Sequence, residues 1–316
     1  MSEQKPFNQN VIAIIWDFDK TLSPVFMQQP LFEHFGVDEE RFWKEVNALP
    51  AYYAKINVTV QPDSCYLGHL LTCVREGIMP GLNNRLLREL GARIPLYPGL
   101  PECFDRINRL LDHDEYAEAD LRVEHYVVST GLKEMILGTP IASKLSGIWA
   151  CEFIEVPASF GYNPDSAPEH GVISQIATLL DNTTKTRALF EINKGVNKTP
   201  GISVNDAIPE TSRRVPFRNM IYIADGPSDI PCFSVVRKNG GMTYAVYDPA
   251  SKRHFQQAVG LQESERVHAF GPADYTENSH TDWWLRYQVR RIADRMLEER
   301  KNALNKSIQP APTHGA

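Results

Sequence analysis

Six consecutive apolar residues, VIAIIW at positions 11–16, lead without interruption into two aspartates separated by one residue, Asp17 and Asp19. An unbroken apolar run of this length, rich in β-branched residues, is typical of a strand buried on both faces of a sheet. A buried parallel strand delivers the residues after it to the carboxyl edge of the sheet, where open α/β folds bind ligands. Two carboxylates there are costly unless a cation or phosphate chemistry uses them. The alternative interpretation is an ordinary Asp-rich turn, and the rest of the chain decides between the two.

Two other predicted strands also end in polar residues. The apolar run at 123–128 leads into Ser129, and the run at 220–224 leads into Asp225 and Asp229. The carboxyl ends of parallel strands share one edge of a sheet, so residues remote in sequence can meet there in one crevice. The sequence therefore predicts a cluster of carboxylates and a hydroxyl at a single site.

Strands and helices alternate after residue 95. Strands at 149–156 and 241–247 complete the predicted set, and amphipathic helices are expected at 100–111 and 184–194, the second ending at Gly195. Alternation of this kind predicts an α/β fold, a Rossmann-like doubly wound parallel sheet with helices on both faces.

Other segments of this half are less regular. Thr139-Pro140 and Asp248-Pro249 are each expected to open a helix, because proline is favoured at the first helical position. The polar segment 157–183 is expected to form a long loop or hairpin, and 202–218 is expected to be irregular.

The periodicity between residue 23 and residue 95 is helical throughout. Asp38 and Asp63 are placed as helix N-caps, and Gly91 follows the last apolar position. No strand-like run interrupts the segment, so residues 24–95 are predicted to form an all-helical cap inserted after the first strand. The expected helices cover 30–35, 38–49, 62–78 and 83–90.

The remaining chain is assigned to a catalytic core, a terminal helix and a tail. The core would comprise residues 1–23 and 96–280, followed by a helix at 281–305 and a disordered tail at 306–316, which is rich in proline and polar residues. The helix carries an apolar stripe that we expect to pack on the chain's own core rather than on a second copy, which favours a monomer. The stripe consists of Leu285, Val289, Ile292 and Met296.

Composition narrows the class of protein. A net charge of −6 argues against a general nucleic-acid binder, and no apolar stretch approaches the length needed to span a membrane. Residues 1–10 lack the features of a signal peptide. The five cysteines are odd in number, widely spaced and without a CxxC pair, which fits free thiols in a reducing cytoplasm. We therefore expect a cytoplasmic protein without nucleic-acid or membrane partners.

The chemistry that uses such a cluster is phosphoryl transfer through a covalent aspartyl phosphate. One carboxylate attacks phosphorus while a hard divalent cation offsets the charge between that carboxylate and the phosphate. A hydroxyl and backbone N–H groups hold other phosphate oxygens, and a lysine supplies fixed positive charge to the transition state.

The motifs that carry this chemistry resemble those of a known superfamily. They read DFDKTL from Asp17, VVSTG ending at Gly131, a lysine before a helix, and DGPSD from Asp225. In this order they resemble the haloacid dehalogenase-like (HAD) superfamily, and their spacing resembles its phosphoserine-phosphatase-like branch, which has a helical C1-type cap. Each motif alone is weak evidence, whereas the ordered set is specific.

The resemblance implies a role for each residue of the first two motifs. Asp17 would be the nucleophile. Asp19 would be the general acid and then the general base, with its carbonyl on the metal. Thr21 would steady the loop, while Ser129 and the N–H of Thr130 would hold phosphate.

The last two motifs supply the metal site and the lysine. The resemblance implies that Asp225 binds Mg²⁺, together with Asp17, and that Asp229 positions the metal shell or the lysine. Lys185 is the preferred lysine because it stands at a helix start in front of an apolar stripe. Lys194 is the competitor, but it lies in a last turn, where a lysine is more simply a C-terminal cap.

The function predicted in this way is Mg²⁺-dependent hydrolysis of a small phosphorylated metabolite. The alternative is a non-enzymatic Mg²⁺- or phosphate-binding module or phospho-receiver, which would need neither a general acid nor a lid. Ala224 replaces the glycine of many members, and residues 23–29 lack the glutamate that binds the substrate amino group in phosphoserine phosphatases, so phosphoserine is not implied. By location alone, the candidates for substrate selection are Gln28, Gln29, Tyr52, Tyr53 and Lys55.

Overall fold

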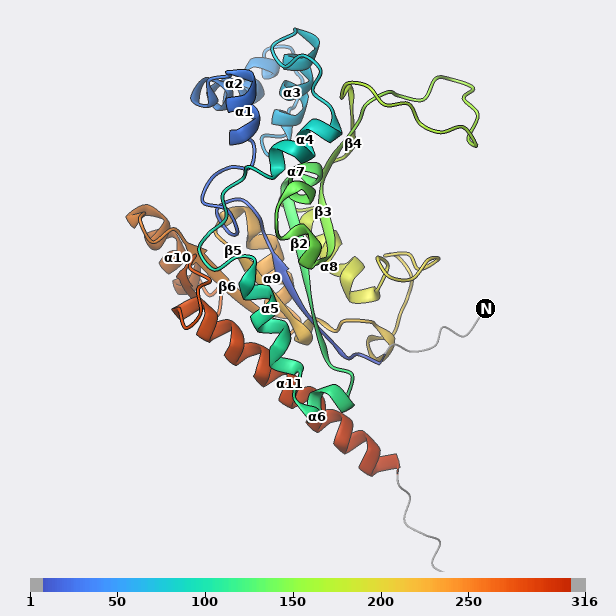
Figure 1. Ribbon diagram of the computed structural model, residues 1–316, viewed down its shortest axis with the longest axis vertical. Coiled ribbons are helices and arrows are strands. Elements are labelled where there is room, and N and C mark those ends of the chain that lie inside the picture. Colours follow the sequence, from blue (N-terminus) through green and yellow to red (C-terminus); the bar gives the residue numbers. More distant parts are fainter. Residues whose placement is uncertain (1–7, 308–316) are drawn as a thin grey trace, which may run out of the picture.

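A seven-stranded sheet with the order β4-β3-β2-β1-β5-β6-β7 forms the centre of the computed structural model, which describes residues 8–307 (Figure 1). Neighbouring strands are parallel except for the pair β3 and β4. The predicted α/β fold with a doubly wound sheet is therefore confirmed. The strands are β1 (Val11–Trp16), β2 (Arg122–Leu132), β3 (Leu145–Ile154), β4 (Gln175–Thr178), β5 (Met220–Ala224), β6 (Met242–Tyr247) and β7 (Ala269–Pro272).

Strand β1 occupies the middle of the sheet. Each of its six residues is fully buried, as the unbroken apolar run predicts. Trp16, its last residue, pairs with Val127 of β2 on one side and with Ile223 of β5 on the other. The chain crosses in opposite directions on the two sides of β1, so the crevice beyond Trp16 is a topological switch point, where α/β sheets bind ligands.

Helices cover both faces of the sheet. Helices α5 (Glu102–Asn108) and α11 (His280–Ser307) lie against one face, and α8 (Lys185–Lys194) and α9 (Ile230–Lys238) lie against the other (Figure 1). The apolar stripe of α11 is buried on the core of the same chain, as expected, and Trp284 stacks on Tyr244 with ring centroids 4.2 Å apart. The remaining helices of the core are α6 (Asp114–Glu118), α7 (Lys133–Gly138) and α10 (Lys252–Glu263).

The segment between β1 and β2 begins with four helices and contains no strand. They are α1 (Gln29–Phe35), α2 (Glu39–Ala54), α3 (Cys65–Arg75) and α4 (Asn84–Gly91), and they lie beyond the carboxyl edge of the sheet (Figure 1). Asp38 caps α2 as predicted, because its carboxylate accepts a hydrogen bond from the backbone N–H of Arg41 at 3.1 Å.

Two glycines fix the last of these helices to the core. A Cβ atom on Gly91 of α4 would lie 2.0 Å from the carbonyl oxygen of Met135, and one on Gly138 of α7 would lie 1.9 Å from that of Arg88. The guanidinium of Arg88 also reaches the carboxylate of Glu134 at 2.8 Å. Helix α4 therefore docks backbone to backbone on α7, which holds the helical segment in place over the sheet edge.

Several predicted helix boundaries are wrong. Thr139-Pro140 opens no α-helix, because α7 ends just before it and the Thr139 hydroxyl donates to the carbonyl of Ile136. Helix α10 begins three residues after Pro249, where the Ser251 hydroxyl accepts from the N–H of His254. Asp63 precedes the cap position of α3, which Ser64 occupies without a side-chain hydrogen bond. Gly91 belongs to α4 instead of following it.

The segments without clear periodicity contain short elements, and of the two forms expected for 157–183, a long loop or a hairpin, the structure has the hairpin. Segment 157–183 includes β4, which pairs antiparallel with β3, and its outer part projects away from the sheet as a long excursion (Figure 1). Segment 202–218 forms turns and short 3₁₀ helices. Helix α11 extends to Ser307, beyond the predicted end at 305, and the rest of the predicted tail lies outside the described residues, as do residues 1–7.

Two further features of the structure concern the cysteines and the hydropathy of the helices. Within residues 8–307, the five cysteines are free thiols, four of them buried and Cys65 half-buried. None of the described helices is both long enough and apolar enough to cross a bilayer.

Candidate active site

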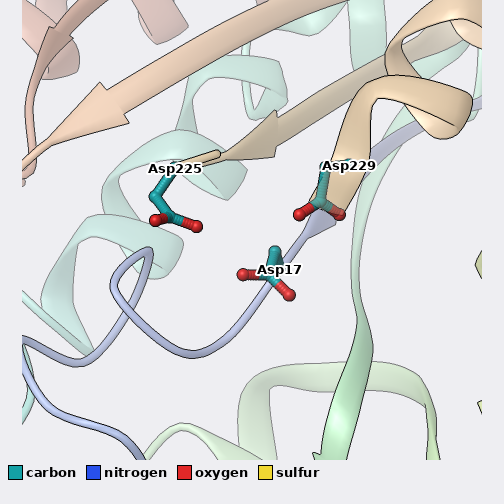
Figure 2. Close-up of side chains that lie close together, drawn as sticks. All are labelled: Asp17, Asp225 and Asp229. Atoms are coloured by element: carbon teal, nitrogen blue, oxygen red, sulfur yellow. The ribbon is translucent and has the colours of Figure 1, made fainter. Parts of the chain in front are cut away.

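Carboxylates from two central strands meet beyond the end of β1. Asp17 follows β1 directly, while Asp225 and Asp229 follow β5, and the side chains of all three point into the same space (Figure 2). One carboxylate oxygen from each lies within 4.8 Å of the others. The DFDKTL and DGPSD motifs, from distant parts of the sequence, therefore converge at this edge of the sheet.

Lys185 is the buried cation of the site. Its side chain is 1% exposed, and its ammonium nitrogen donates to Asp17 Oδ1 at 2.7 Å and to Asp229 Oδ1 at 2.8 Å. Burial alone lowers the pKa of a lysine, but the two carboxylates outweigh burial and raise the pKa of Lys185 above its ordinary value. Lys194 lies at the other end of α8, where it donates to the carbonyls of Val204 and Asp206. Lys185, and not Lys194, thus reaches the carboxylates.

Asp229 holds this lysine in position. The carboxylate is fully buried and accepts from Lys185 and from the Tyr222 hydroxyl on Oδ1, and from the Ser228 hydroxyl on Oδ2. These donors occupy much of the hydrogen-bonding capacity of Asp229. Asp17 and Asp225 are therefore the carboxylates with more capacity left for a ligand.

Negative charge exceeds positive charge among these groups. Burial outweighs the opposing effect of Lys185 and, together with the charge of Asp229, raises the pKa of Asp17 to about 6. Burial and then the charge of Asp17 raise the pKa of Asp19 to about 7. The pKa of Asp225 lies well above its usual range through burial and through repulsion by Asp17 and Asp229. One buried ammonium does not neutralise these carboxylates, and a hard cation with oxygen ligands, such as Mg²⁺, fits this set of donors.

Asp19 links the site to the helical segment above it. Its Oδ1 accepts a hydrogen bond from the backbone N–H of Met27 at 2.8 Å. Thr21, in the turn two residues after Asp19, is fully buried, and its hydroxyl donates to Asp17 Oδ2 at 3.2 Å. Thr21 thus orients the Asp17 carboxylate, whereas Asp19 faces the entrance to α1.

The end of β2 forms the opposite side of the site. Ser129 is 1% exposed, and its hydroxyl accepts from the N–H of Gly131 at 3.0 Å. The carbonyl of Thr130 accepts from the hydroxyl of Tyr66 at 2.7 Å, which connects α3 to the core. A Cβ on Gly131 would lie 2.2 Å from the end of the Met27 side chain, so the helical segment packs closely against the core here. Ser129 and Thr130 both line the cavity described next.

A cavity of about 610 Å³ separates these residues from the helical segment. Its floor carries the acidic residues and Lys185, and its roof is formed by residues from the α1–α3 region. Trp43 stands at the centre of the roof, with its ring centroid 5.6 Å from that of Phe26 and 5.8 Å from that of Tyr66. Below, "floor" denotes Asp17, Asp19, Ser129, Lys185 and Asp225, which line the cavity, together with Asp229, which is fully buried and bonded to Lys185. "Roof" denotes Phe26, Gln28, Trp43, Val46, Asn47, Pro62, Asp63 and Tyr66.

Only one of the five residues proposed for substrate selection lies on this cavity. Gln28 lines it, whereas Gln29 instead donates to the carboxylate of Glu33 at 3.1 Å. Tyr52 is 62% exposed, with the Lys55 ammonium 5.7 Å from its ring. Those residues and Tyr53 lie outside the lining of the cavity, so their expected location at the site is wrong.

Other lining residues carried no recognisable signal in the sequence. Asn182 precedes α8, and Arg253, His254 and Gln257 come from α10. The Gln257 amide donates to the carbonyl of Asp225 at 3.1 Å and so supports the loop after β5. These residues belong to no motif, and they reach the cavity only because α8 and α10 begin at the same sheet edge.

A protein of Borreliella burgdorferi, described as uncharacterized, is 36% identical to this chain over 287 residues. The alignment covers 89% of this chain and 97% of the relative. The chain belongs to the same family as this protein. No protein-family model matches the chain.

Solved structures of similar shape have low sequence identity to this chain. A probable phosphoserine phosphatase of Vibrio cholerae gives a TM-score of 0.49 at 12% identity, covering 92% of this chain and 68% of that one. A HAD family hydrolase of Salmonella enterica serovar Typhi gives 0.48 at 14% identity, covering 84% and 67%. A phosphoserine phosphatase solved as a phospho-aspartyl intermediate analogue gives 0.45 at 16% identity, covering 83% and 93%. Similarities of this size assign no activity.

Proposed function

We propose that this chain is a HAD-like phosphatase, which hydrolyses a small phosphorylated metabolite through a phosphate covalently bound to Asp17. The observation that carries the proposal is the position of the Asp17 carboxylate. It lies at the switch point of the sheet, 2.7 Å from the ammonium of Lys185 and close to the carboxylate of Asp225. A nucleophilic carboxylate needs this combination, because nearby positive charge keeps it ionised and stabilises the phosphoryl group during transfer.

The proposed reaction has two steps. In the first, an oxygen of Asp17 attacks phosphorus, the bond from phosphorus to the ester oxygen breaks, and Asp19 donates a proton to the departing alcohol. In the second, Asp19 takes a proton from water, whose oxygen attacks the phosphorus and releases inorganic phosphate from Asp17. Lys185 stabilises the charge on the equatorial oxygens in both steps. Ser129 and the N–H of Thr130 are the groups on the other side of the site that would bind phosphate oxygens.

The side chains of Asp17 and Asp225 and the carbonyl of Asp19 would hold Mg²⁺. Its charge would offset the repulsion between the carboxylate and the phosphate. Asp229 would contribute indirectly, since its carboxylate is already engaged by Lys185, Tyr222 and Ser228.

A phospho-receiver or a simple phosphate-binding module fits the site less well. Neither needs a general acid beside the nucleophile or an enclosed space for a leaving group. Here Asp19 joins the floor to the entrance of α1 through its bond to the N–H of Met27, and the roof covers a cavity large enough for a small metabolite. Both features support turnover.

The proposal is tested by hydrolysis of p-nitrophenyl phosphate and a panel of alkyl phosphate esters. We expect EDTA to abolish release of phosphate and Mg²⁺ to restore it, with Asp17→Asn inactive in all conditions. Full activity of the chelated, metal-free protein would refute the metal assignment. Stable phosphorylation of Asp17 without turnover, in the presence of Mg²⁺, would instead support the receiver.

A further inference from the structure

The roof of the cavity presents rings where a ligand's organic part would lie. Phe26 is 44% exposed, Trp43 is half-buried, and the two rings tilt toward each other at 47°. The Lys20 ammonium lies 4.9 Å from the Phe26 ring and donates to the carbonyl of Pro24, which holds that ring at the cavity edge. Aromatic faces of this kind favour a flat apolar group over a flexible or anionic one.

The roof carries few charged groups. Within the described residues, the helical segment contributes no lysine, arginine or histidine to the cavity lining. Its one ionisable carboxyl, that of Asp63, is exposed at the rim. An anionic group on the leaving alcohol, such as the carboxylate of a phosphorylated amino acid, would therefore meet no cation from the helical segment itself. The lysines and the arginine that line the cavity, Lys20, Lys185 and Arg253, belong to the core.

One polar group of the roof lacks a partner. Gln28 is 2% exposed, and its side-chain oxygen has no hydrogen-bond partner among the described residues. The neighbouring hydroxyl of Tyr66 cannot serve it, because the single hydrogen of that hydroxyl is donated to the carbonyl of Thr130. A buried acceptor left unpaired is destabilising, so it marks a place where a donor from outside the chain would bind.

Gln28 also lies next to the point where the leaving group departs. The backbone N–H of the preceding residue, Met27, is bonded to Asp19, which would protonate the departing oxygen. The group attached to that oxygen would thus lie between the Gln28 amide and the Trp43 ring, in the cavity that they share.

We infer that the substrate is the phosphate ester of an uncharged planar ring that carries a hydrogen-bond donor. The ring packs against Trp43 and Phe26, and its donor, an O–H or N–H group, binds the side-chain oxygen of Gln28. This inference rests on the proposed function, because it places the phosphate over Asp17. It concerns the roof, however, and can be tested by binding without turnover.

Non-hydrolysable phosphonates test ligand selection by the roof separately from hydrolysis by the floor. Calorimetry in the presence of Mg²⁺ would measure the affinities of two matched pairs of ligands. The first pair is benzylphosphonate and cyclohexylmethylphosphonate. The second pair is the hydroxybenzylphosphonate isomer that binds most tightly and the methylbenzylphosphonate with its methyl group at the same position. We expect the flat ring to bind about tenfold more tightly than the saturated ring. We also expect the hydroxybenzylphosphonate to bind about tenfold more tightly than the methylbenzylphosphonate, whose methyl group is of equal size.

Variants identify the groups responsible. Gln28→Leu should abolish the preference for hydroxyl over methyl and keep the preference for the flat ring, whereas Trp43→Leu should reduce the ring preference to about twofold. Gln29→Leu, a matched change outside the cavity, should alter neither. Because Gln28→Leu removes an unpaired buried acceptor, its melting temperature should not fall. A lower melting temperature with an unchanged hydroxyl preference would assign Gln28 a structural role and refute the inference.

The remaining outcomes each decide one of the two proposals. Equal affinity for hydroxyl and methyl ligands would mean that Gln28 binds only water, and equal affinity for flat and saturated rings would remove the aromatic roof as a selector. Either result, or no binding of any phosphonate, overturns this inference. Both preferences without hydrolysis of the corresponding phosphate esters would retain the inference and overturn the phosphatase. Hydrolysis of all the esters with equal efficiency would retain the phosphatase alone.

Discussion

The floor and the roof of the cavity differ in charge and in how their polar groups are paired. On the floor, Lys185 is bonded to both Asp17 and Asp229, and Asp229 has two further donors. The roof is mostly aromatic and apolar, and the buried side-chain oxygen of Gln28 has no partner within residues 8–307. Fixed, mutually bonded charges suit a reaction that is the same for every phosphate ester. An apolar wall with one free acceptor suits the choice among esters.

The largest loss of activity and stability is expected when Lys185, the buried cation of the floor, is replaced. Lys185→Met leaves Asp17 and Asp229 as buried carboxylates without a positive partner, so we expect kcat/KM to fall by at least about 1,000-fold. The free energy of unfolding should fall by about 3–5 kcal/mol. Steady-state hydrolysis and urea melts measure the two effects.

Lys194→Met provides the control from the same helix. The Lys194 ammonium bonds only to loop carbonyls at the far end of α8, so activity should change less than about twofold. A loss of activity in Lys194→Met as large as that in Lys185→Met would contradict the assignment of the cationic residue.

The next effect concerns the contact between α7 of the core and α4 of the helical segment that carries the roof. Gly138→Ala places a Cβ atom against the backbone of Arg88 in α4, which cannot move aside as a flexible side chain can. We expect a loss of about 1–3 kcal/mol in the free energy of unfolding, and weaker binding of ligands that contact the roof.

Gly68→Ala is the matched change at a helical glycine with open space around it. Alanine there meets nothing within 4 Å and should stabilise the protein by about 0.5–1 kcal/mol, because glycine is a poor helix former. Thermal melts of the two variants should move in opposite directions. Equal stability of both would mean that α4 and α7 are not in close contact in solution.

The smallest effect concerns the layer beneath the floor. His125 is 1% exposed, its Nδ1 accepts from the Trp16 indole N–H at 3.3 Å, and its Nε2 contacts the Asn108 side-chain oxygen at 3.1 Å. Both contacts suit the neutral ring. Burial lowers the pKa of His125 from 6.5 to about 3.

The unfolded chain therefore binds a proton below pH 6.5 that the folded protein does not bind. The contribution of His125 to stability is complete above pH 6.5 and declines as the pH falls toward 3, by about 1.4 kcal/mol at pH 5.5. His125→Asn keeps an acceptor near Trp16 and should remove this part of the pH dependence. Urea melts at pH 7.5, 6.5 and 5.5 measure it, and parallel pH profiles for the two proteins would show that His125 is protonated in the fold.

The floor was predictable from the sequence because its signals are local. The continuous apolar runs of β1 and β5 end directly at Asp17 and Asp225, and Lys185 was distinguished by its place at a helix start. Local signals also set the limits of the prediction. Strand β7 went unnoticed because four residues containing Gly271 and Pro272 do not resemble a strand, and Thr139-Pro140 resembled a helix start although α7 had already ended.

The roof could not be predicted in the same way. Trp43 and Tyr66 occupy ordinary apolar positions of amphipathic helices, and the residues that face the cavity are decided by how the helical segment docks over the sheet edge. That docking depends on contacts between distant segments, such as Gly91 on α7 and the Tyr66 hydroxyl on Thr130. No periodicity in the sequence encodes them.

The most direct test of the account separates Asp17 from Asp19 in one pre-steady-state experiment. With p-nitrophenyl phosphate the departing phenolate hardly needs an acid, whereas attack of water on the phosphorylated aspartate still needs a base. Asp19→Asn should therefore release up to one equivalent of nitrophenolate and then stall, with phosphate found on Asp17 by mass spectrometry, and Asp17→Asn should give no burst. A normal steady-state rate in Asp17→Asn, or phosphate on another residue, would contradict the account.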